Sequence, residues 1–393
     1  MDKHSKKSSS LLHYPVLVVF SLFFIGLFAL DLITPDRAYS EMENTTLSQR
    51  PALTQLSAKG LNSYFTAYTK YVKDQVFGRD EWISLQSVVE TTLLQKEQNG
   101  GILLGKEHMM FPRTFGLLDS ENRTLPKNTA AVEALCQRHP GKVDVLLAPA
   151  ASVIYPENVP ANAPLLDEDA YLDQLSAAVQ AAGGRFVDVR QTLAEHKDEY
   201  IYYRTDHHWT SLGAYYAYCA AAKTLGYSAY TLDQFNIETA SSSFRGTLYS
   251  KTLDNGVTPD SIDYFHLASG GPKVKMTVFD GAKETVYDSL YVRSYLDVKD
   301  KYSSFTGSNS PIVTIETDVD SGKNLLLIKD SYAHSLVPFL ANHYSKITMV
   351  DMRYINVDLG RLIDLSEYQQ AMFMYNAVTF SSDLTIKRIS LTK

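Results

Sequence analysis

The sequence predicts an α/β protein with a mainly parallel, doubly wound sheet, and three observations support this fold class. Residues 143–148 (VDVLLA) form a short apolar run of the kind found in a buried parallel strand. A helical pattern over residues 167–182 and a strand pattern over 185–189 follow it. The same alternation of strand and helix returns between residues 324 and 375. Open sheets of this class bind ligands beyond the carboxyl ends of their strands, so residues that follow strands are the first site candidates.

The composition narrows the class of protein. A chain of 393 residues with a formal net charge of -7 is long enough for one large domain, and its acidity argues against nucleic acid as a partner. The 26 tyrosines are compatible with a sugar-facing surface, although tyrosines also sit half-buried at the rims of sheets. Cys136 and Cys219 are too few for a disulfide scaffold, and we expect two buried thiols rather than one bridge.

The N-terminus predicts a membrane segment. Three lysines precede an apolar run, and the twenty residues 11–30 would just span a bilayer as a helix. The basic flank places the N-terminus in the cytoplasm and the body of the chain outside it. We therefore expect residues 1–34 to be a cytoplasmic N-terminus and single-pass anchor, and the polar residues 35–52 to be a stalk. A cleaved signal peptide, with secretion of the rest, is the alternative.

Residues 53–393 are expected to form one extracytoplasmic domain. Its first part, 53–98, has apolar residues at helical spacing. Residues 235–321 hold short β-branched and aromatic runs separated by turn residues, which indicates an antiparallel β-rich insertion. The remaining expected elements are helices at 128–139, 210–226, 331–344 and 362–370, and strands at 102–106, 273–279, 284–292, 324–328, 346–350 and 371–375.

The densest cluster of chemically active residues is Asp206, His207 and His208, which are consecutive. Histidine and aspartate are costly to bury unless something pairs with them, so such a cluster has few purely structural explanations. It precedes a helical pattern that Thr210 or Ser211 can cap, which predicts a loop-to-helix junction. Side chains at such a junction can face a cleft while the backbone is held by regular structure.

A serine at a strand-to-helix turn is the second feature. The strand ending at residue 328 runs into Lys329-Asp330-Ser331-Tyr332, which places the Ser331 hydroxyl at the carboxyl edge of the sheet. Its N–H group, at a helix N-terminus, can donate to an oxyanion. Serine needs a base to become a nucleophile, and His208 can be that base with Asp206 holding its tautomer. Alternatively, Ser331 or Asp330 is simply the helix cap.

Several segments resemble one known family. Residues 205–210, followed by Gly213-Ala214, resemble the DHHW protein family and the TDxHW segment of alginate O-acetyltransferases in the SGNH-hydrolase-like superfamily. Residues 329–332 are similar to the serine segment of the same family, and residues 155–157 and 77–80 are weaker matches. The resemblance covers the chain from about residue 41 onward.

The resemblance implies a flattened SGNH-like α/β/α sandwich with a Ser-His-Asp site for acyl transfer to or from polysaccharide. It carries the catalytic roles to Ser331, His208 and Asp206 of this sequence. It also implies a cell-surface polysaccharide as partner and a membrane-embedded protein that donates acetyl groups. In this sequence Asp330 adds negative charge beside the serine, which would raise the pKa of a nearby base and oppose an oxyanion. His207 has no counterpart in the alginate enzymes and would bind substrate or orient the loop.

The oxyanion hole is less well specified. SGNH enzymes use a glycine and an asparagine besides the serine N–H, and Gly307 with Asn309 is one candidate source. Asn376, at the end of the last strand, is another, and Tyr155 is a candidate substrate contact. Each of these residue types is also common in ordinary turns.

Three alternatives remain open from the sequence. Asp206, His207 and His208 are metal-ligand types that His108 or His334 could complete, but no spaced histidine motif supports zinc, so we expect no metal and no cofactor. A non-catalytic carbohydrate-binding or cell-envelope scaffold protein would also suit the anchor and the tyrosines. A sugar acetylesterase would use the same residues with water as acceptor.

Overall fold

The structure is a computed structural model that describes residues 14–43, 45–54, 60–114, 124–163 and 165–389. Its internal contacts divide the chain into two compact units, Met1–Val89 and Glu90–Lys393. The strands and helices of the α/β fold, and the side chains of the candidate site, all lie in the second unit.

The first unit contains three helices of the described chain: α1 (Pro15–Ile33), α3 (Leu61–Gln75) and α4 (Arg79–Val88). Among the described residues, α1 is the one helix long and apolar enough to cross a membrane, and a signal sequence would pass the same test. Residues 53–89, which the sequence led us to group with the catalytic domain, fall in this unit. In these two helices, α3 buries none of its residues and α4 buries only Asp80 and Ser87. The short strands β1 (Tyr39–Ser40) and β2 (Thr45–Thr46) pair with each other.

The second unit is built on an eight-stranded sheet with the order β11-β10-β12-β14-β13-β15-β6-β7. The strands from β14 to β7 are parallel, and the other three pairs are antiparallel. The strands are β6 (Val143–Ala148), β7 (Arg185–Phe186), β10 (Val274–Phe279), β11 (Glu284–Tyr287), β12 (Ile312–Thr317), β13 (Asn324–Lys329), β14 (Lys346–Val350) and β15 (Gln370–Asn376).

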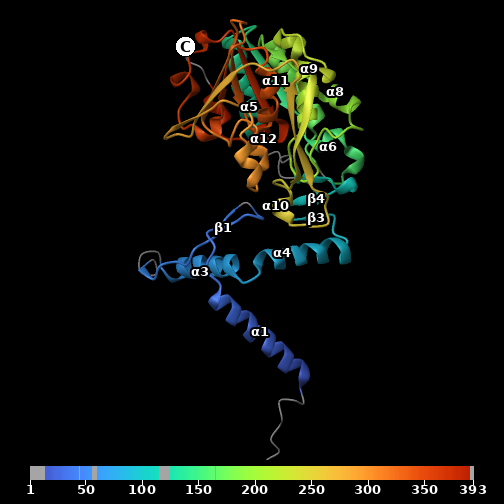
Figure 1. Ribbon diagram of the computed structural model, residues 1–393, viewed down its shortest axis with the longest axis vertical. Helices are drawn as coiled ribbons and strands as arrows, with labels where there is room; N and C mark the ends of the chain where they lie inside the picture. The colour runs from blue at the N-terminus through green and yellow to red at the C-terminus, as the bar shows by residue number, and fades with distance from the viewer. Residues whose placement is uncertain (1–13, 44, 55–59, 115–123, 164, 390–393) are drawn as a thin grey trace, which may run out of the picture. The chain divides into compact units, whose positions relative to one another are not determined.

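Alternate residues of the parallel strands enter two different cores, because successive side chains of a strand point to opposite faces. On one face, Leu325 and Leu327 pack with helix α9 (Ser211–Leu225). On the other, Leu326 and Ile328 pack with α5 (Thr124–Arg138), α7 (Glu168–Ala181) and α12 (Ala377–Ser382). Figure 1 shows α8 (Arg190–Glu195) near α9 and α5 near α12. The predicted α/β/α sandwich with a mainly parallel sheet is therefore confirmed.

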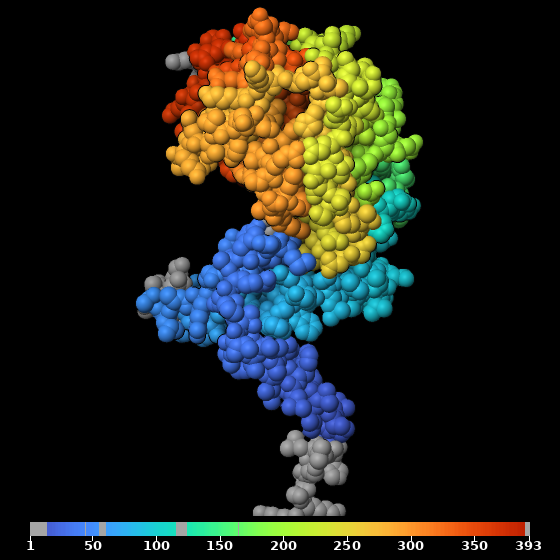
Figure 2. Space-filling view, in the orientation of Figure 1, coloured from blue at the N-terminus to red at the C-terminus, as the bar shows by residue number. Residues whose placement is uncertain are grey.

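The antiparallel β-rich region is also present, but it is not a separate body. Strands β8 (Phe235–Phe244) and β9 (Asp260–Leu267) form their own two-stranded sheet. Strands β10, β11 and β12 instead extend the main sheet beyond β14. In the space-filling view the yellow and orange segments form much of the visible face of the second unit (Figure 2).

Two of the expected helices are wrong in length. Instead of one helix over 331–344, a 3-10 turn (Ser331–Ser335) is followed by α11 (Val337–Leu340). Pro338 lacks an N–H group, so it cannot continue a helical ladder from the preceding turn. Residues 362–370 hold only a 3-10 turn, Leu365–Glu367, because the Asp364 side chain accepts from Ser366 N and competes with helix formation. Both cysteines are free thiols as expected, with Cys136 buried and Cys219 half-buried.

Among the other short elements of the described chain are a π-helical turn (Val89–Leu93), which begins at the last residue of the first unit, and α6 (Ala151–Ile154) and α10 (Tyr249–Thr252). Strands β3 (Gln98–Asn99), β4 (Ile102–Leu104) and β5 (Met110–Pro112) form a three-stranded sheet of their own.

Candidate active site

The loop that carries the two histidines is closed at its base. Tyr202 and Trp209 form an antiparallel bridge across it. Thr210 then begins α9 as its N-cap, and its side chain accepts a hydrogen bond from Gly213 N. This cap was predicted from the sequence, and it fixes the direction in which the loop leaves the helix.

A buried carboxylate on β9 binds the backbone of the histidine loop. Asp260 is fully buried and accepts hydrogen bonds from Tyr200 Oη at 2.6 Å, Arg204 N at 2.9 Å and Thr205 N at 2.8 Å. Backbone N–H groups that would otherwise be buried without partners are thereby satisfied. This anchor could not be predicted from the local sequence, because Asp260 lies more than fifty residues further along the chain than the loop it binds.

Trp209 joins the histidine loop to the serine segment. Its indole Nε1 donates to Tyr332 O at 3.1 Å and to Ser335 Oγ at 3.0 Å, and the side chain is fully buried. A buried tryptophan needs a partner for its N–H, and here that partner belongs to the turn that follows β13. The tryptophan of the Asp-His-His-Trp block is therefore a structural link between two segments that are distant in sequence.

This link places an acid, an imidazole and an alcohol in line. His208 Nδ1 lies 2.5 Å from Asp206 Oδ1, and His208 Nε2 lies 2.7 Å from Ser331 Oγ. An ionised carboxylate can only accept, so Nδ1 carries the proton and Nε2 is left as an acceptor for the serine O–H. Asp206 and His208 are buried while Ser331 is half-buried, so the hydroxyl is the end of the line nearest solvent. This is the geometry of a nucleophile, its base and the group that orients the base.

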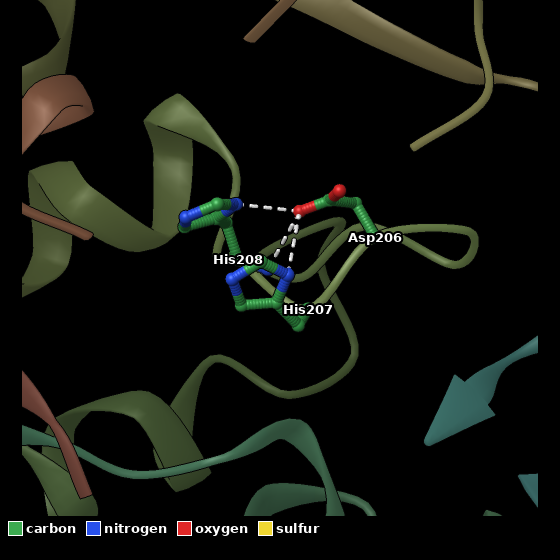
Figure 3. Close-up of side chains that lie close together, drawn as sticks. All are labelled: Asp206, His207 and His208. Atoms are coloured by element: carbon green, nitrogen blue, oxygen red, sulfur yellow. Dashed lines mark hydrogen bonds and ion pairs between the residues drawn. The ribbon is translucent and has the colours of Figure 1, made fainter. Parts of the chain in front are cut away.

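Asp206 is held in its charged form. Oδ1 also accepts from His208 N at 3.0 Å, and Oδ2 accepts from Thr247 N at 2.7 Å and Thr247 Oγ1 at 2.9 Å. Burial by itself would raise the pKa of Asp206, but the neighbouring His208 and His207 and these hydrogen bonds outweigh burial and hold the pKa below its ordinary value. Figure 3 shows both imidazole rings directed at the same carboxylate.

Sequence reasoning missed three residues around this line. Thr247 holds Asp206 as described above, and beside it Gly246 is required because a Cβ there would collide with the Asp206 carboxylate. Tyr302 stacks on the His208 ring, with centroids 3.9 Å apart and an interplanar angle of 10°, and its hydroxyl donates to Ser331 O at 3.0 Å. An Arg-Gly-Thr turn and one tyrosine among 26 carry no signal that would single them out in the sequence.

His207 faces outward from the same cluster. Its side chain is 30% exposed, and Nδ1 lies 2.7 Å from Thr247 Oγ1. The Thr247 hydroxyl donates its one hydrogen bond to Asp206 Oδ2, so it accepts a hydrogen bond from His207 Nδ1–H. His207 Nε2 is therefore left as an acceptor. Partial burial and the neighbouring His208 lower the pKa of His207, so the ring is neutral at neutral pH. A neutral imidazole with a free acceptor nitrogen suits a hydroxyl-bearing ligand.

The same three residues were considered as metal ligands. One ligand atom from each of Asp206, His207 and His208 can be chosen so that all lie within 4.8 Å of one another. However, His208 Nδ1 is hydrogen-bonded to the Asp206 carboxylate, and His207 Nδ1 to Thr247. In this arrangement the two Nδ1 atoms are therefore engaged in hydrogen bonds, and the absence of a metal stays a prediction.

Asp330, not Ser331, caps the turn after β13. Its Oδ1 accepts from Tyr332 N at 2.9 Å and its Oδ2 from Asn376 N at 2.8 Å. Burial raises its pKa, and Arg353 together with these two N–H groups works against that rise. The carboxylate is therefore committed to backbone groups of the sheet edge, and the Ser331 N–H remains at the start of the helical turn, where it has no intrahelical partner.

A second polar cluster lies behind the serine segment. Lys329 Nζ is 2.8 Å from His334 Nε2 and 3.4 Å from Asp351 Oδ2, and Asp351 also pairs with Arg353 at 2.6 Å. Asn309 Oδ1 joins this cluster at 3.1 Å from His334 Nε2. His334, which the sequence offered as a residue that could complete a metal site, is 2% exposed, because it follows the buried end of β13 into this cluster.

The other four predicted contacts of the oxyanion or substrate make different interactions. The Asn376 side chain caps α12 and donates to Ala148 O at 3.1 Å. Tyr155 Oη donates to a backbone carbonyl 3.4 Å away, and Gly307 occupies a turn with φ of +83°. Within the described residues, neither these three nor Asn309 is hydrogen-bonded to Ser331 or His208. Their proposed roles stay predictions.

The comparisons with known proteins agree with this fold and sequence pattern. The model of the DHHW protein family matches residues 169–350. This match confirms the resemblance to the DHHW protein family. A solved DHHW family protein from Eubacterium siraeum is 23% identical, with a TM-score of 0.56, and the alignment covers 75% of this chain and 98% of that chain. Bacillus cereus PatB1, solved with a sulfonyl adduct, is 17% identical with a TM-score of 0.58, over 74% of this chain and 98% of that chain.

The curated relatives are more limited in coverage. The protein named probable alginate O-acetylase AlgJ from Pseudomonas aeruginosa is 26% identical over 163 residues, 40% of this chain and 40% of that protein. Its namesake from Pseudomonas syringae pv. tomato is 26% identical over 183 residues, 45% of each. The chain thus spans less than half the length of the curated relatives it matches. The solved structures share an SGNH-like fold with this chain.

Proposed function

We propose that this protein is an extracytoplasmic acyltransferase that moves acetyl groups to cell-surface polysaccharide through Ser331, His208 and Asp206. The observation that carries the proposal is the unbroken hydrogen-bonded line from Asp206 through His208 to Ser331, with the serine at the solvent end. The matched relatives named alginate O-acetylases support the choice of acetyl group and polysaccharide.

The chemistry has two halves. Ser331 Oγ attacks the carbonyl carbon of an acetyl ester, and its proton moves to His208 Nε2. The donor oxygen then leaves with that proton, which forms acetyl-Ser331. In the second half an acceptor hydroxyl gives its proton to His208 Nε2 and takes the acetyl group, and the proton returns to Ser331 Oγ. Asp206 stabilises the imidazolium in each half, and the Ser331 N–H at the helical turn is placed to donate to the oxyanion.

The N-terminal helix supports a location at the cell envelope. We propose that α1 is retained as a single-pass membrane anchor, with residues from about 35 onward outside the cytoplasm, in line with its three preceding lysines. A membrane-embedded protein that donates acetyl groups is the partner that such an anchored transferase would need. A water-accepting acetylesterase would use the same three side chains, so acceptor dependence decides between transfer and hydrolysis.

The test is an acetyl-release assay with p-nitrophenyl acetate, with and without oligosaccharide acceptors, on the wild type and Ser331→Ala. We expect release by the wild type to fall by at least about 10³-fold in the variant, since the nucleophile is removed. We also expect acetylated oligosaccharide from the wild type alone. Ser303→Ala is a matched control, since Ser303 is a buried serine bonded to Asp300 instead of a histidine. Equal rates for the wild type and Ser331→Ala would remove the enzymatic proposal and favour a non-catalytic carbohydrate-binding protein.

A further inference from the structure

We propose that α3 and the turn that joins it to α4 lie in the interface of a lipid bilayer, with one apolar face among the lipids. This rests on the proposed retention of α1 as an anchor and is independent of the chemistry at Ser331. It concerns the first unit alone, which the proposed acyl transfer does not use.

The first observation is an exposed apolar face on α3. Leu61, Phe65, Tyr68 and Val72 recur at three- and four-residue intervals, which places them on one side of the helix. Their exposed fractions are 62%, 58%, 36% and 46%. Four large apolar or aromatic side chains in a row, none of them buried, are unusual for a helix whose surroundings are water alone.

The other exposed face of the same helix is polar. Asn62, Thr66 and Lys70 are exposed and lie on a separate stripe, which begins beside the apolar row at Asn62 and reaches the opposite side of the helix at Lys70. A helix with an apolar face, a polar face with lysines and low overall hydrophobicity is the type that lies in the plane of a membrane surface.

The second observation is where this helix is attached. Phe77 N, in the turn between α3 and α4, donates to Asp31 Oδ1 at 3.0 Å, and Asp31 belongs to the last turn of α1. Arg37 pairs with Asp80 at 2.9 Å, and Gln75 Nε2 donates to Arg37 O at 2.8 Å. If α1 spans a bilayer, its last turn lies at the membrane surface, so these bonds hold the α3–α4 turn at that depth.

The aromatic side chains of the turn and of the first turn of α4 suit that depth. Trp82 is 42% exposed and Phe77 36% exposed. The Trp82 indole N–H is satisfied by Phe77 O at 3.1 Å, so the ring can enter lipid without leaving a buried donor unpaired. Amphipathic aromatic rings concentrate at the level of the lipid headgroups. A bilayer is therefore a better occupant of this surface than the apolar patch of a second protein, because the bilayer is already fixed beside it by α1.

The first test uses the two tryptophans of the full chain, Trp82 and Trp209. The purified protein is reconstituted in phosphatidylcholine vesicles with or without lipids brominated near the headgroup end of the acyl chain. Trp209 is fully buried in the second unit, so the Trp82→Phe variant reports the emission of Trp209 alone, which lipid should not reach. We expect brominated lipid to lower the wild-type emission attributable to Trp82 by at least half and to leave Trp82→Phe unchanged. Quenching of Trp82 by aqueous iodide with no effect of brominated lipid would overturn the proposal.

The second test compares the two faces of α3 by spin labelling. Nitroxides are attached at Phe65→Cys and Lys70→Cys in a Cys219→Ser background, where the remaining thiol, Cys136, is buried. We expect the label at position 65 to be several-fold more accessible to oxygen than to a water-soluble nickel complex, and the reverse at position 70. Equal accessibilities at the two positions would contradict an interfacial helix.

The failure modes are distinct. Release of the full chain from vesicles by alkaline wash would defeat the anchor proposal itself. The chain could instead stay in the vesicles while Trp82 is accessible to iodide there but shielded in native membranes. That result would contradict the lipid interface and indicate a protein partner on this face. Neither result would bear on acetyl release through Ser331.

Discussion

Two buried polar clusters flank the serine turn, and they use similar residues in different ways. In one, His208 stands between the Asp206 carboxylate and the Ser331 hydroxyl. In the other, His334 stands between Thr306 Oγ1 at 2.5 Å and Lys329 Nζ at 2.8 Å. Both histidines are almost fully buried, so burial alone does not distinguish a candidate catalytic residue from a structural one.

The difference lies in the partners. His334 Nε2 accepts a hydrogen bond from the Lys329 ammonium group. Burial together with Lys329 lowers the pKa of His334 well below its ordinary value, so the ring stays neutral. Its cluster ends in the Asp351–Arg353 pair and offers no reactive group to solvent. The Asp206 line ends in a half-exposed hydroxyl, and its carboxylate stabilises any charge that His208 gains. A histidine can act as a base when an anion is behind it and a substrate can reach its partner.

The largest expected effect comes from removing that anion. Asp206→Asn should lower acetyl release about 10⁴-fold, because the amide can donate to His208 Nδ1 and so favour the wrong tautomer. The measurement is single-turnover acetylation of Ser331 in the wild type and the variant. Asp300→Asn, which changes a nearby exposed carboxylate bonded to Ser303, is the control and should change the rate little. If both variants acetylated Ser331 equally slowly, the rate would not depend specifically on the contact between Asp206 and His208.

A substitution in the second cluster should lower the stability of the protein and not the rate of acetylation. Lys329→Met removes the buried ammonium group that His334 and Asp351 share and leaves Asp351 with Arg353 as its remaining cation. It should lower the free energy of unfolding by about 3–5 kcal/mol. Urea denaturation measures this loss. Lys275→Met removes a lysine from a pair with Glu316 that is more than half exposed on both sides, and should change stability by less than about 1 kcal/mol. If Lys329→Met unfolds normally yet loses acetylation, the two clusters are not separate.

A smaller effect on the rate is expected from removing the Thr247 hydroxyl group, which donates to Asp206. Thr247→Val removes the hydroxyl that donates to Asp206 Oδ2 at 2.9 Å but keeps the backbone donor. One hydrogen bond to a charged group corresponds to about 10- to 100-fold in rate if it is lost in the transition state. Thr247→Ser keeps the hydroxyl and should restore most of the activity. A Thr247→Ser variant as slow as Thr247→Val would show that the methyl group matters instead.

The smallest effect should appear only in acid. The pKa of Asp206 is below its ordinary value in the folded state, so its charge contributes stability above the unfolded-state pKa of about 3.9 and loses that contribution as the pH falls below it. Wild-type stability should therefore decline more steeply than that of Asp206→Asn between about pH 5 and pH 3. Parallel declines in thermal unfolding would contradict an ionised Asp206 in the folded protein.

Part of this arrangement could be predicted from the sequence because the signals are local. The VDVLLA strand, the helix after Thr210 with its cap and the strand before Ser331 all rest on hydrophobic spacing and on cap chemistry within a few residues. The helix expected over 331–344 failed for a local reason as well, since Pro338 interrupts it. The adjacent Asp-His-His-Trp residues identified the loop because few structural needs place such residues side by side.

From the sequence alone came the identity of three candidate reactive groups and the class of sheet that carries them. What only the tertiary structure decided is their surroundings: Thr247 and Gly246 behind Asp206, Tyr302 against the His208 ring, and Asp260 holding the loop. These contacts join residues about forty to ninety-five positions apart along the chain, and nothing in the local pattern of either partner records the other. The charge of a buried carboxylate depends on every donor that reaches it, and in this protein two of those donors come from a turn near the β8–β9 pair.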